Sequence, residues 1–318
     1  MTYSRRKFIV NSGLLVGSAK LKLPFHSIEK NSKTLTGNRL ILLGTQGGPV
    51  IRSYKSSPSA SCIVYDDMRY LIDAGYGTSF KLVEANISLA SVDYIFITHH
   101  HSDHNLDLGP LLYNAWVAGL AKNIQVFAPV GLKSLLDFYW KSNDFDIETR
   151  IQDEGRSDIR TLIKPTEYKE GTLLSQHNAK IKALRNIHPP IKESYALKFE
   201  MSNKVIVFSG DTAYCPELIE FASGADYLVH EVMYGPGIDK LVSRRPNASK
   251  LKASILSHHT LAEDVGRIAD QAKVKCLVLN HFVPGDDASL TDDVWKTAVG
   301  KNFRGEIVVG KSFLELPL

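Results

Sequence analysis

The stretch Thr98-His99-His100-His101-Ser102-Asp103-His104 ends the apolar run of residues 92–98. A short apolar run of this kind predicts a buried strand. Side chains at positions i and i+2 of an extended chain project to the same side, so His99 and His101 can bind one metal ion. The turn that follows can bring Asp103 and His104 toward a second ion. The spacing therefore predicts a metal site at the end of this strand.

The composition is that of an ordinary globular protein. The chain has 318 residues, of which 44% are hydrophobic and 23% charged, and this length suits one large domain or two ordinary ones. The three cysteines, Cys62, Cys215 and Cys276, are far apart, which excludes a disulfide framework and a Cys-x-x-Cys metal site. No apolar stretch approaches the roughly 18 residues of a membrane-spanning helix. We therefore expect no membrane span.

The N-terminus carries an export signature. Residues 4–9 read Ser-Arg-Arg-Lys-Phe-Ile, the twin-arginine pattern, and Gly17-Ser18-Ala19 supplies small residues at a possible cleavage point. We predict a signal segment at residues 1–19, a polar linker at 20–38 and a periplasmic location; the alternative is a disordered basic start. Loss of residues 1–19 removes three cations and no acid, so the formal charge falls from +4 to +1. A nearly neutral mature chain lacks the broad positively charged surface that binds nucleic acid, so we expect no nucleic-acid partner.

The remaining chain alternates predicted strands and helices. This alternation indicates an α/β layered fold. With no linker or repeat inside it, residues 39–318 are predicted to form a single domain. The predicted strands are 39–43, 61–65, 69–72, 92–98, 124–128, 194–200, 204–209, 226–230, 275–280 and 306–309, and the predicted helices are 108–120, 131–140, 216–222 and 261–272.

The histidine cluster resembles the signature of the metallo-β-lactamase superfamily, whose members fold as an αββα sandwich of two mixed sheets flanked by helices. Three later motifs fit the same family: Ile187-His188-Pro189-Pro190, Phe208-Ser209-Gly210-Asp211-Thr212 and Leu279-Asn280-His281-Phe282. The resemblance implies two metal sites that share Asp211. Mixed imidazole and carboxylate ligands favour two Zn²⁺ ions, with Mn²⁺ or Fe²⁺ as alternatives. The implied ligands are His99, His101, His188 and Asp211 at site one, and Asp103, His104, Asp211 and His281 at site two.

Two further motifs resemble those of ribonuclease Z and its relatives. They are Val229-His230-Glu231-Val232 and Ser257-His258-His259-Thr260. The resemblance implies that His258, steadied by Glu231, acts on the leaving group, and that Asp103 orients a metal-bridging hydroxide, which is the nucleophile. The alternative for His258 is that it caps a helix beginning near residue 261.

Flanking motifs at residues 44–49, 98–110, 185–190 and 281–285 resemble the arylsulfatase-like branch of the superfamily. This resemblance implies a hydrolase of small aryl sulfate esters, with a homodimer as a weak expectation. The alternatives are a phosphodiesterase (cyclic nucleotide or ribonuclease Z-like), a lactonase or thioesterase, and a metal-binding protein without catalysis. Against transfer RNA processing, residues 189–210 leave little room for the substrate-gripping arm that ribonuclease Z carries in that interval.

Overall fold

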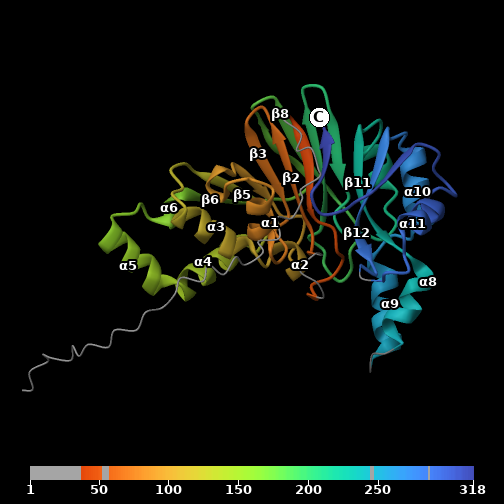
Figure 1. Ribbon diagram of the computed structural model, residues 1–318, viewed down its shortest axis with the longest axis horizontal. Coiled ribbons are helices and arrows are strands. Elements are labelled where there is room, and N and C mark those ends of the chain that lie inside the picture. The colour runs from red at the N-terminus through yellow and green to blue at the C-terminus, as the bar shows by residue number, and fades with distance from the viewer. Residues whose placement is uncertain (1–36, 52–56, 244–246, 286) are drawn as a thin grey trace, which may run out of the picture. The chain divides into compact units, whose positions relative to one another are not determined.

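Two mixed β-sheets of seven strands pack face to face in the computed structural model, with helices against their outer faces (Figure 1). The αββα prediction is thereby confirmed. The structure describes residues 37–51, 57–243, 247–285 and 287–318. The predicted signal segment and almost all of the predicted linker lie outside these residues and stay predictions. Residues 35–318 form one compact unit.

The first sheet combines an antiparallel half with a parallel half. Its β14, β1, β2 and β3 are antiparallel neighbours, whereas β3, β4, β5 and β6 are parallel. In spatial order the strands are β14 (Leu314–Pro317), β1 (Arg39–Gly44), β2 (Ala60–Tyr65), β3 (Met68–Ile72), β4 (Tyr94–Phe96), β5 (Ile124–Ala128) and β6 (Ile163–Glu167).

The second sheet is built in the same way. Its β13, β12, β11 and β10 are parallel, and β10, β9, β8 and β7 are antiparallel. In spatial order the strands are β13 (Glu306–Val309), β12 (Cys276–Val283), β11 (Tyr227–Met233), β10 (Val205–Phe208), β9 (Tyr195–Met201), β8 (Ala179–Arg185) and β7 (Gly171–Gln176).

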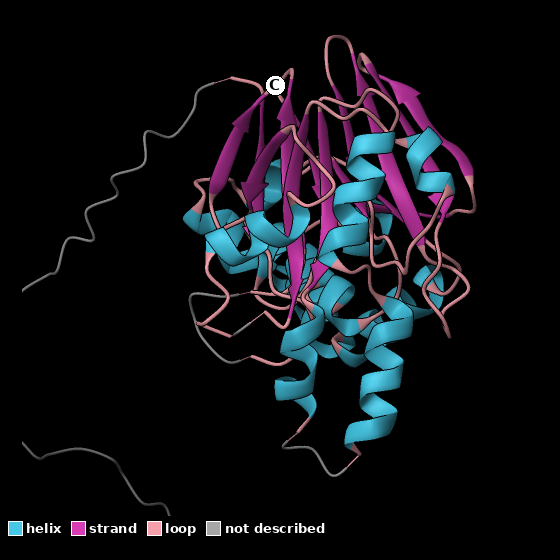
Figure 2. Ribbon diagram, turned by 90° about the vertical axis from the view of Figure 1, so that its right-hand side faces the viewer, coloured by secondary structure: helices cyan, strands magenta, loops and turns pink. Residues whose placement is uncertain are grey.

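The helices fall into three groups. One group covers the first sheet, and α7, α10 and α11 cover the second. The third is the pair α8 and α9, which extends beyond the ends of the sheets (Figure 2). The helices are α1 (Thr78–Glu84), the 3₁₀ turn η1 (Leu89–Ser91), α2 (Ser102–Asn105), α3 (Leu108–Val117), α4 (Leu132–Ser142), α5 (Asp144–Glu154), α6 (Ile159–Leu162), α7 (Glu217–Phe221), α8 (Gly235–Val242), α9 (Ala248–His258), α10 (Ala262–Gln271) and α11 (Asp292–Val299).

Aromatic side chains fill the space between the sheets. Phe96 of β4 stacks on Phe127 with ring centroids 4.9 Å apart and meets Phe199 of β9 edge-on at 5.4 Å. Phe96 and Phe199 are fully buried. Burial of one such side chain contributes about 1.5–3 kcal/mol to folding, and the edge-on pairing adds to this. The packing therefore holds β4 against the second sheet, whose strand ends carry the other ligands.

Candidate metal centre

The residues predicted as ligands meet at one edge of the sandwich. His99 and His101 follow β4, α2 carries Asp103 and His104, and Asp211 follows β10. The carboxyl ends of parallel strands lie at the same edge of a sheet, which is where α/β proteins place their sites. This arrangement explains why motifs more than 100 residues apart converge. His188, from the β8–β9 connection, and His281, from β12, complete the set.

The four residues expected at site one form a compact group. The Nδ1 atom of His101 lies 3.0 Å from Nε2 of His99 and 3.0 Å from Nε2 of His188. Asp211 Oδ2 is 3.9 Å from His99 Nε2. Ligands about 2.0–2.1 Å from a tetrahedral zinc ion lie roughly 3.3 Å from one another, so the spacing fits such an ion.

The four residues expected at site two are equally close. Asp211 Oδ2 lies 3.2 Å from Nε2 of His281 and 3.3 Å from Nε2 of His104. Asp103 Oδ2 is 3.3 Å from His281 Nε2 and also accepts a hydrogen bond from the Gly48 N–H at 2.9 Å. In each group of four, all ligand atoms lie within 4.8 Å of one another. Asp211 belongs to both groups, as its predicted bridging role requires.

The buried charge of the centre also fits cations. Asp73, Asp103, Asp211 and Glu231 are all nearly inaccessible to solvent. Within the described part of the chain, their ion pairs are with histidines only. Buried carboxylates are stable only when paired or bound to metal. The buried atoms His104 Nε2 and Asp211 Oδ1 also have no hydrogen-bond partner among the described residues. The residues present therefore fit a pair of divalent cations.

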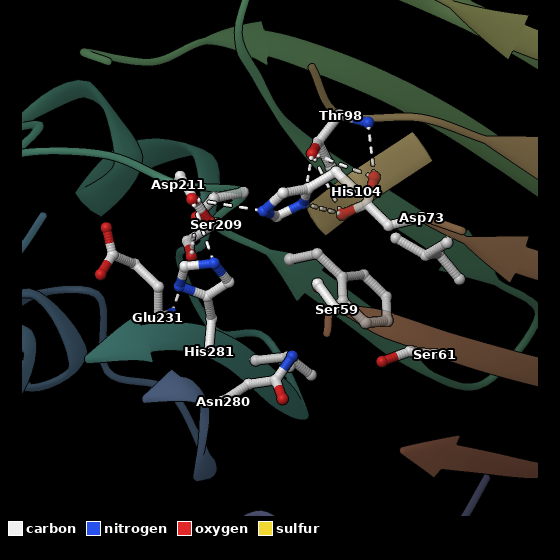
Figure 3. A pocket seen from close by; sticks show the side chains of 14 residues that line it. Ser59, Ser61, Asp73, Thr98, His104, Ser209, Asp211, Glu231, Asn280 and His281 are labelled. Atoms are coloured by element: carbon white, nitrogen blue, oxygen red, sulfur yellow. Dashed lines mark hydrogen bonds and ion pairs between the residues drawn. The ribbon is translucent and has the colours of Figure 1, made fainter. Parts of the chain in front are cut away.

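Hydrogen bonds from residues outside the ligand set fix which ring nitrogen of two ligand histidines can bind metal. Asp73 Oδ2 accepts a hydrogen bond from Nδ1 of His104 at 2.8 Å, which leaves Nε2 facing Asp211 (Figure 3). The carbonyl oxygen of His258 lies 3.1 Å from Nδ1 of His188 and can only accept. His188 must therefore donate from Nδ1 and present Nε2 to site one. Such outer contacts orient metal-binding histidines in general. Asp73 was not predicted from the sequence to belong to the site.

Burial keeps the site-one histidines neutral. It lowers the pKa of His99 and His101 and brings that of His188 to about 4. Burial acts in the same direction on His104, but the carboxylates of Asp211, Asp73 and Asp103 outweigh it and hold the pKa of that imidazole well above its ordinary value. A metal ion at site two therefore competes with a proton for His104 Nε2.

Local backbone irregularities aim two of the ligands. Glu231 of β11 pairs with Asn280, but Val232 pairs with Phe282, so His281 is the extra residue of a β-bulge. Its φ is +42°, and bulges of this kind turn a side chain toward a site. Gly210, before Asp211, has φ +59°, and a Cβ there would lie 2.6 Å from the carbonyl oxygen of Tyr195. Only glycine fits this position.

The partner of Glu231 is His259, and the expected pairing with His258 is wrong. Nδ1 of His259 lies 3.1 Å from Oε1 of Glu231, which also accepts the Thr212 N–H at 2.8 Å. His258 is the last residue of α9, and His259 follows in extended conformation, so the two side chains point in different directions. The ring of His258 instead lies 5.3 Å from that of His188. Nor does His258 cap the next helix, which begins after Leu261.

Contact with Glu231 also changes the protonation of His259. Burial lowers the pKa of this imidazole, but the Glu231 carboxylate outweighs burial and raises it to about 9. Glu231, His259 and His281 also form a third group with metal-ligand spacing. Oε1 of Glu231 accepts hydrogen bonds from the Thr212 N–H and His259, whereas its buried Oε2 has no hydrogen-bond partner among the described residues.

A family model described as "Anti-Pycsar protein Apyc1" matches residues 38–242, well over half of the chain. Among curated proteins, ribonuclease Z of Mycobacterium marinum is 28% identical over 274 residues, covering 85% of this chain and 95% of its own length. Ribonuclease Z of Mycobacterium bovis is 26% identical with the same coverage. These relatives favour the phosphodiesterase alternative over the expected aryl sulfate hydrolase. They also leave the expected absence of a nucleic-acid partner without support.

Solved structures agree on the fold. The metallo-β-lactamase fold protein YhfI from Bacillus subtilis superposes with a TM-score of 0.65 at 22% identity, covering 88% of this chain and 98% of that one. Human tRNase Z, short form, superposes with a TM-score of 0.61 at 19% identity, covering 87% of this chain and 98% of that one. Within the described residues, no helix has the length and apolar character needed to cross a membrane. The protein therefore has the metallo-β-lactamase fold.

Proposed function

The chain belongs to the Anti-Pycsar protein Apyc1 family, and from this premise we propose that it is a metal-dependent phosphodiesterase. The observation that carries the proposal is the complete set of seven ligand side chains in a chain that aligns with 95% of the length of a ribonuclease. RNA is a phosphodiester, and the same residues suit any phosphodiester that reaches them. Function depends on the site rather than the fold, so the substrate must be argued from its surroundings.

Two divalent cations bound by these residues would supply positive charge at the phosphorus centre and lower the pKa of an attacking water molecule. In the net reaction the water oxygen bonds to phosphorus, the P–O bond to the leaving group breaks, and one proton ends on the departing alcohol. Asp103, whose carboxylate accepts a hydrogen bond from the Gly48 N–H, would orient the attacking water molecule.

The Glu231–His259 pair is placed to serve the leaving group. Because Glu231 accepts the proton on Nδ1, the Nε2 atom of His259 is the one left to donate. The ring of His259 stacks on that of His281 with centroids 5.5 Å apart, so it borders site two directly. Donation from Nε2 neutralises the departing oxygen, and a proton released by the water restores the imidazole. General acid catalysis of this kind contributes about 10²–10⁴ in rate.

A small substrate fits this chain better than transfer RNA. In the interval between His188 and Asp211, residues 195–208 form β9, β10 and the turn that joins them, and both strands belong to the second sheet. Residues 189–194 are too few to form a separate RNA-gripping arm.

Hydrolysis of bis-p-nitrophenyl phosphate by the metal-loaded protein tests the proposed function. We expect turnover that Asp211→Ala abolishes together with metal binding, because Asp211 belongs to both sites. Undiminished turnover by a correctly folded Asp211→Ala protein would contradict the proposal.

A further inference from the structure

His259 directly follows an exposed helix. That helix, α9, projects beyond the ends of the sheets and has no fully buried residue (Figure 2). A catalytic side chain must be held to within roughly 0.5 Å, and a helix packed so loosely does not hold its end that firmly. The contacts that place His259 must therefore come from the residues on either side of it.

The residue before His259 is bound through its backbone. The carbonyl oxygen of His258 accepts a hydrogen bond from Nδ1 of His188 at 3.1 Å, which joins the end of α9 to a site-one ligand. This contact uses the main chain of His258 and not its imidazole. A single hydrogen bond leaves the chain free to rotate about it, so a second anchor is needed.

Thr260 supplies the second anchor. Its side chain is 1% exposed, and its hydroxyl donates to the carbonyl oxygen of Thr212 at 2.6 Å. The carbonyl oxygen of Thr260 in turn accepts the Met233 N–H at 2.9 Å, at the end of β11. Breaking either contact would leave a buried polar group unpaired, which is costly. The chain immediately after His259 is therefore fixed by both the side chain and the backbone of Thr260.

The contacts meet at Thr212. This fully buried residue follows the bridging ligand Asp211, and its N–H donates to Oε1 of Glu231 at 2.8 Å. The same oxygen lies 3.1 Å from Nδ1 of His259. The N–H of Thr212 thus holds the carboxylate, and its carbonyl oxygen holds the residue next to the imidazole. Thr212, Glu231, His259 and Thr260 form a closed ring of contacts.

We propose that Thr260 is a positioning residue for the leaving-group step: its hydroxyl, bound to the Thr212 carbonyl oxygen, holds the His259 imidazole against Glu231. The proposal rests on the phosphodiesterase function proposed above. Thr260 is buried and belongs to neither group of four ligands, so its effect on turnover passes through His259. Valine at this position keeps the shape of the side chain without the hydroxyl, whereas serine keeps the hydroxyl.

Initial rates on bis-p-nitrophenyl phosphate and metal content, both measured on the metal-loaded protein, test the proposal. We expect Thr260→Val to lower kcat about 10–100-fold, because a small displacement of a catalytic group costs that much, with KM and metal content unchanged. Thr260→Ser should keep most of the wild-type kcat. Thr78→Val is the matched control and should leave kcat unchanged. The Thr78 hydroxyl is equally buried and donates to the Gly75 carbonyl oxygen at 2.6 Å, but Thr78 belongs to α1, against the first sheet.

A double-mutant cycle separates positioning from a general loss of structure. In the His259→Ala background, Thr260→Val should lower kcat no further, because the group that Thr260 positions is gone. A further loss of about tenfold, or a loss of metal in Thr260→Val, would overturn the proposal, since the hydroxyl would then act on the ligands. A wild-type kcat in Thr260→Val would also overturn it. If Thr260→Val does not fold, Thr260→Ala removes the same hydroxyl and must show the same pattern.

Proton NMR of the zinc-loaded protein tests the contact without turnover. The Nδ1–H proton of His259, bound to Glu231, should give a downfield resonance that His259→Ala removes and thereby assigns. Thr260→Val should shift this resonance upfield or lose it to exchange with water, whereas Thr260→Ser should retain it. Absence of the resonance from the wild-type protein, or an unchanged one in Thr260→Val, overturns the proposal. The expected pattern in a protein without phosphodiester turnover would refute the proposed function but leave the placement of His259 by Thr260 standing.

Discussion

Replacing Asp73 by asparagine should selectively weaken metal binding at site two. The carboxylate is 3% exposed and accepts hydrogen bonds from the Thr98 N–H at 2.8 Å and from His104 Nδ1 at 2.8 Å. Asparagine has the same shape and tolerates the φ of +60° at this position. Its oxygen can still accept from the Thr98 N–H, but its NH₂ group then faces Nδ1 of His104. The imidazole is thereby driven to carry its proton on Nε2, the atom that must bind metal.

The size of the effect follows from this change of tautomer. Loss of a carboxylate behind a metal-binding histidine costs about 10–100-fold in metal affinity, or roughly 1.4–2.8 kcal/mol. His104 belongs to site two only, whereas site one is bound by His99, His101, His188 and Asp211. We therefore expect the first metal ion to bind as in the wild-type protein and the second to bind 10–100-fold more weakly.

Titration of the metal-free protein against a competing chelator measures both affinities. Asp93→Asn is the matched control, because Asp93 also accepts a backbone N–H, that of Arg69 at 2.8 Å, but contacts no ligand. Two unchanged affinities in Asp73→Asn, with the control also unchanged, would refute the proposed role of Asp73.

Four other substitutions test the same structure. His259→Ala should lower kcat on bis-p-nitrophenyl phosphate by about 10²–10⁴. His258→Ala should change kcat little, because the His258 ring lies away from Glu231. A large loss of kcat in His258→Ala and a small one in His259→Ala would instead make His258 the residue that acts on the leaving group. Gly210→Ala should reduce the metal content measured by atomic absorption, because the added Cβ meets the Tyr195 carbonyl oxygen at 2.6 Å and displaces Asp211; full metal content would contradict this reasoning. Phe199→Ala should lower the free energy of unfolding in urea by about 3–5 kcal/mol, since it leaves a cavity between the sheets, and a loss below about 1 kcal/mol would show that the core collapses to fill it.

Much of the centre could be predicted because its ligands sit in short motifs. The cluster at His99 places ligand side chains directly after an apolar strand. In the Gly210-Asp211 pair, a glycine that permits a tight turn directly precedes a ligand carboxylate. Apolar patterns also located most strands of the parallel half sheets, where burial on both faces leaves a continuous signal, as in β5 at Ile124–Ala128. The half-exposed edge strand β6 at Ile163–Glu167 was not predicted.

Other features depend on contacts that no local pattern records. The helix α9 has no fully buried residue, so its apolar periodicity is weak and the helix was not predicted from the sequence. Because α9 was not predicted, the choice between His258 and His259 as the partner of Glu231 rested on the family resemblance alone. The strand β7 is a mostly exposed edge strand and was missed for a similar reason. The role of Asp73 depends on its approach to a histidine 31 residues away.

Initial rates on three p-nitrophenyl esters test whether the protein is a phosphodiesterase. Bis-p-nitrophenyl phosphate, p-nitrophenyl sulfate and p-nitrophenyl acetate release the same phenolate, so a preference reports the attacked centre alone. The metal-loaded protein should show its highest kcat/KM on the phosphodiester, and removal of metal should abolish that activity. A higher kcat/KM on the sulfate, or phosphodiester hydrolysis that survives metal removal, would contradict the account.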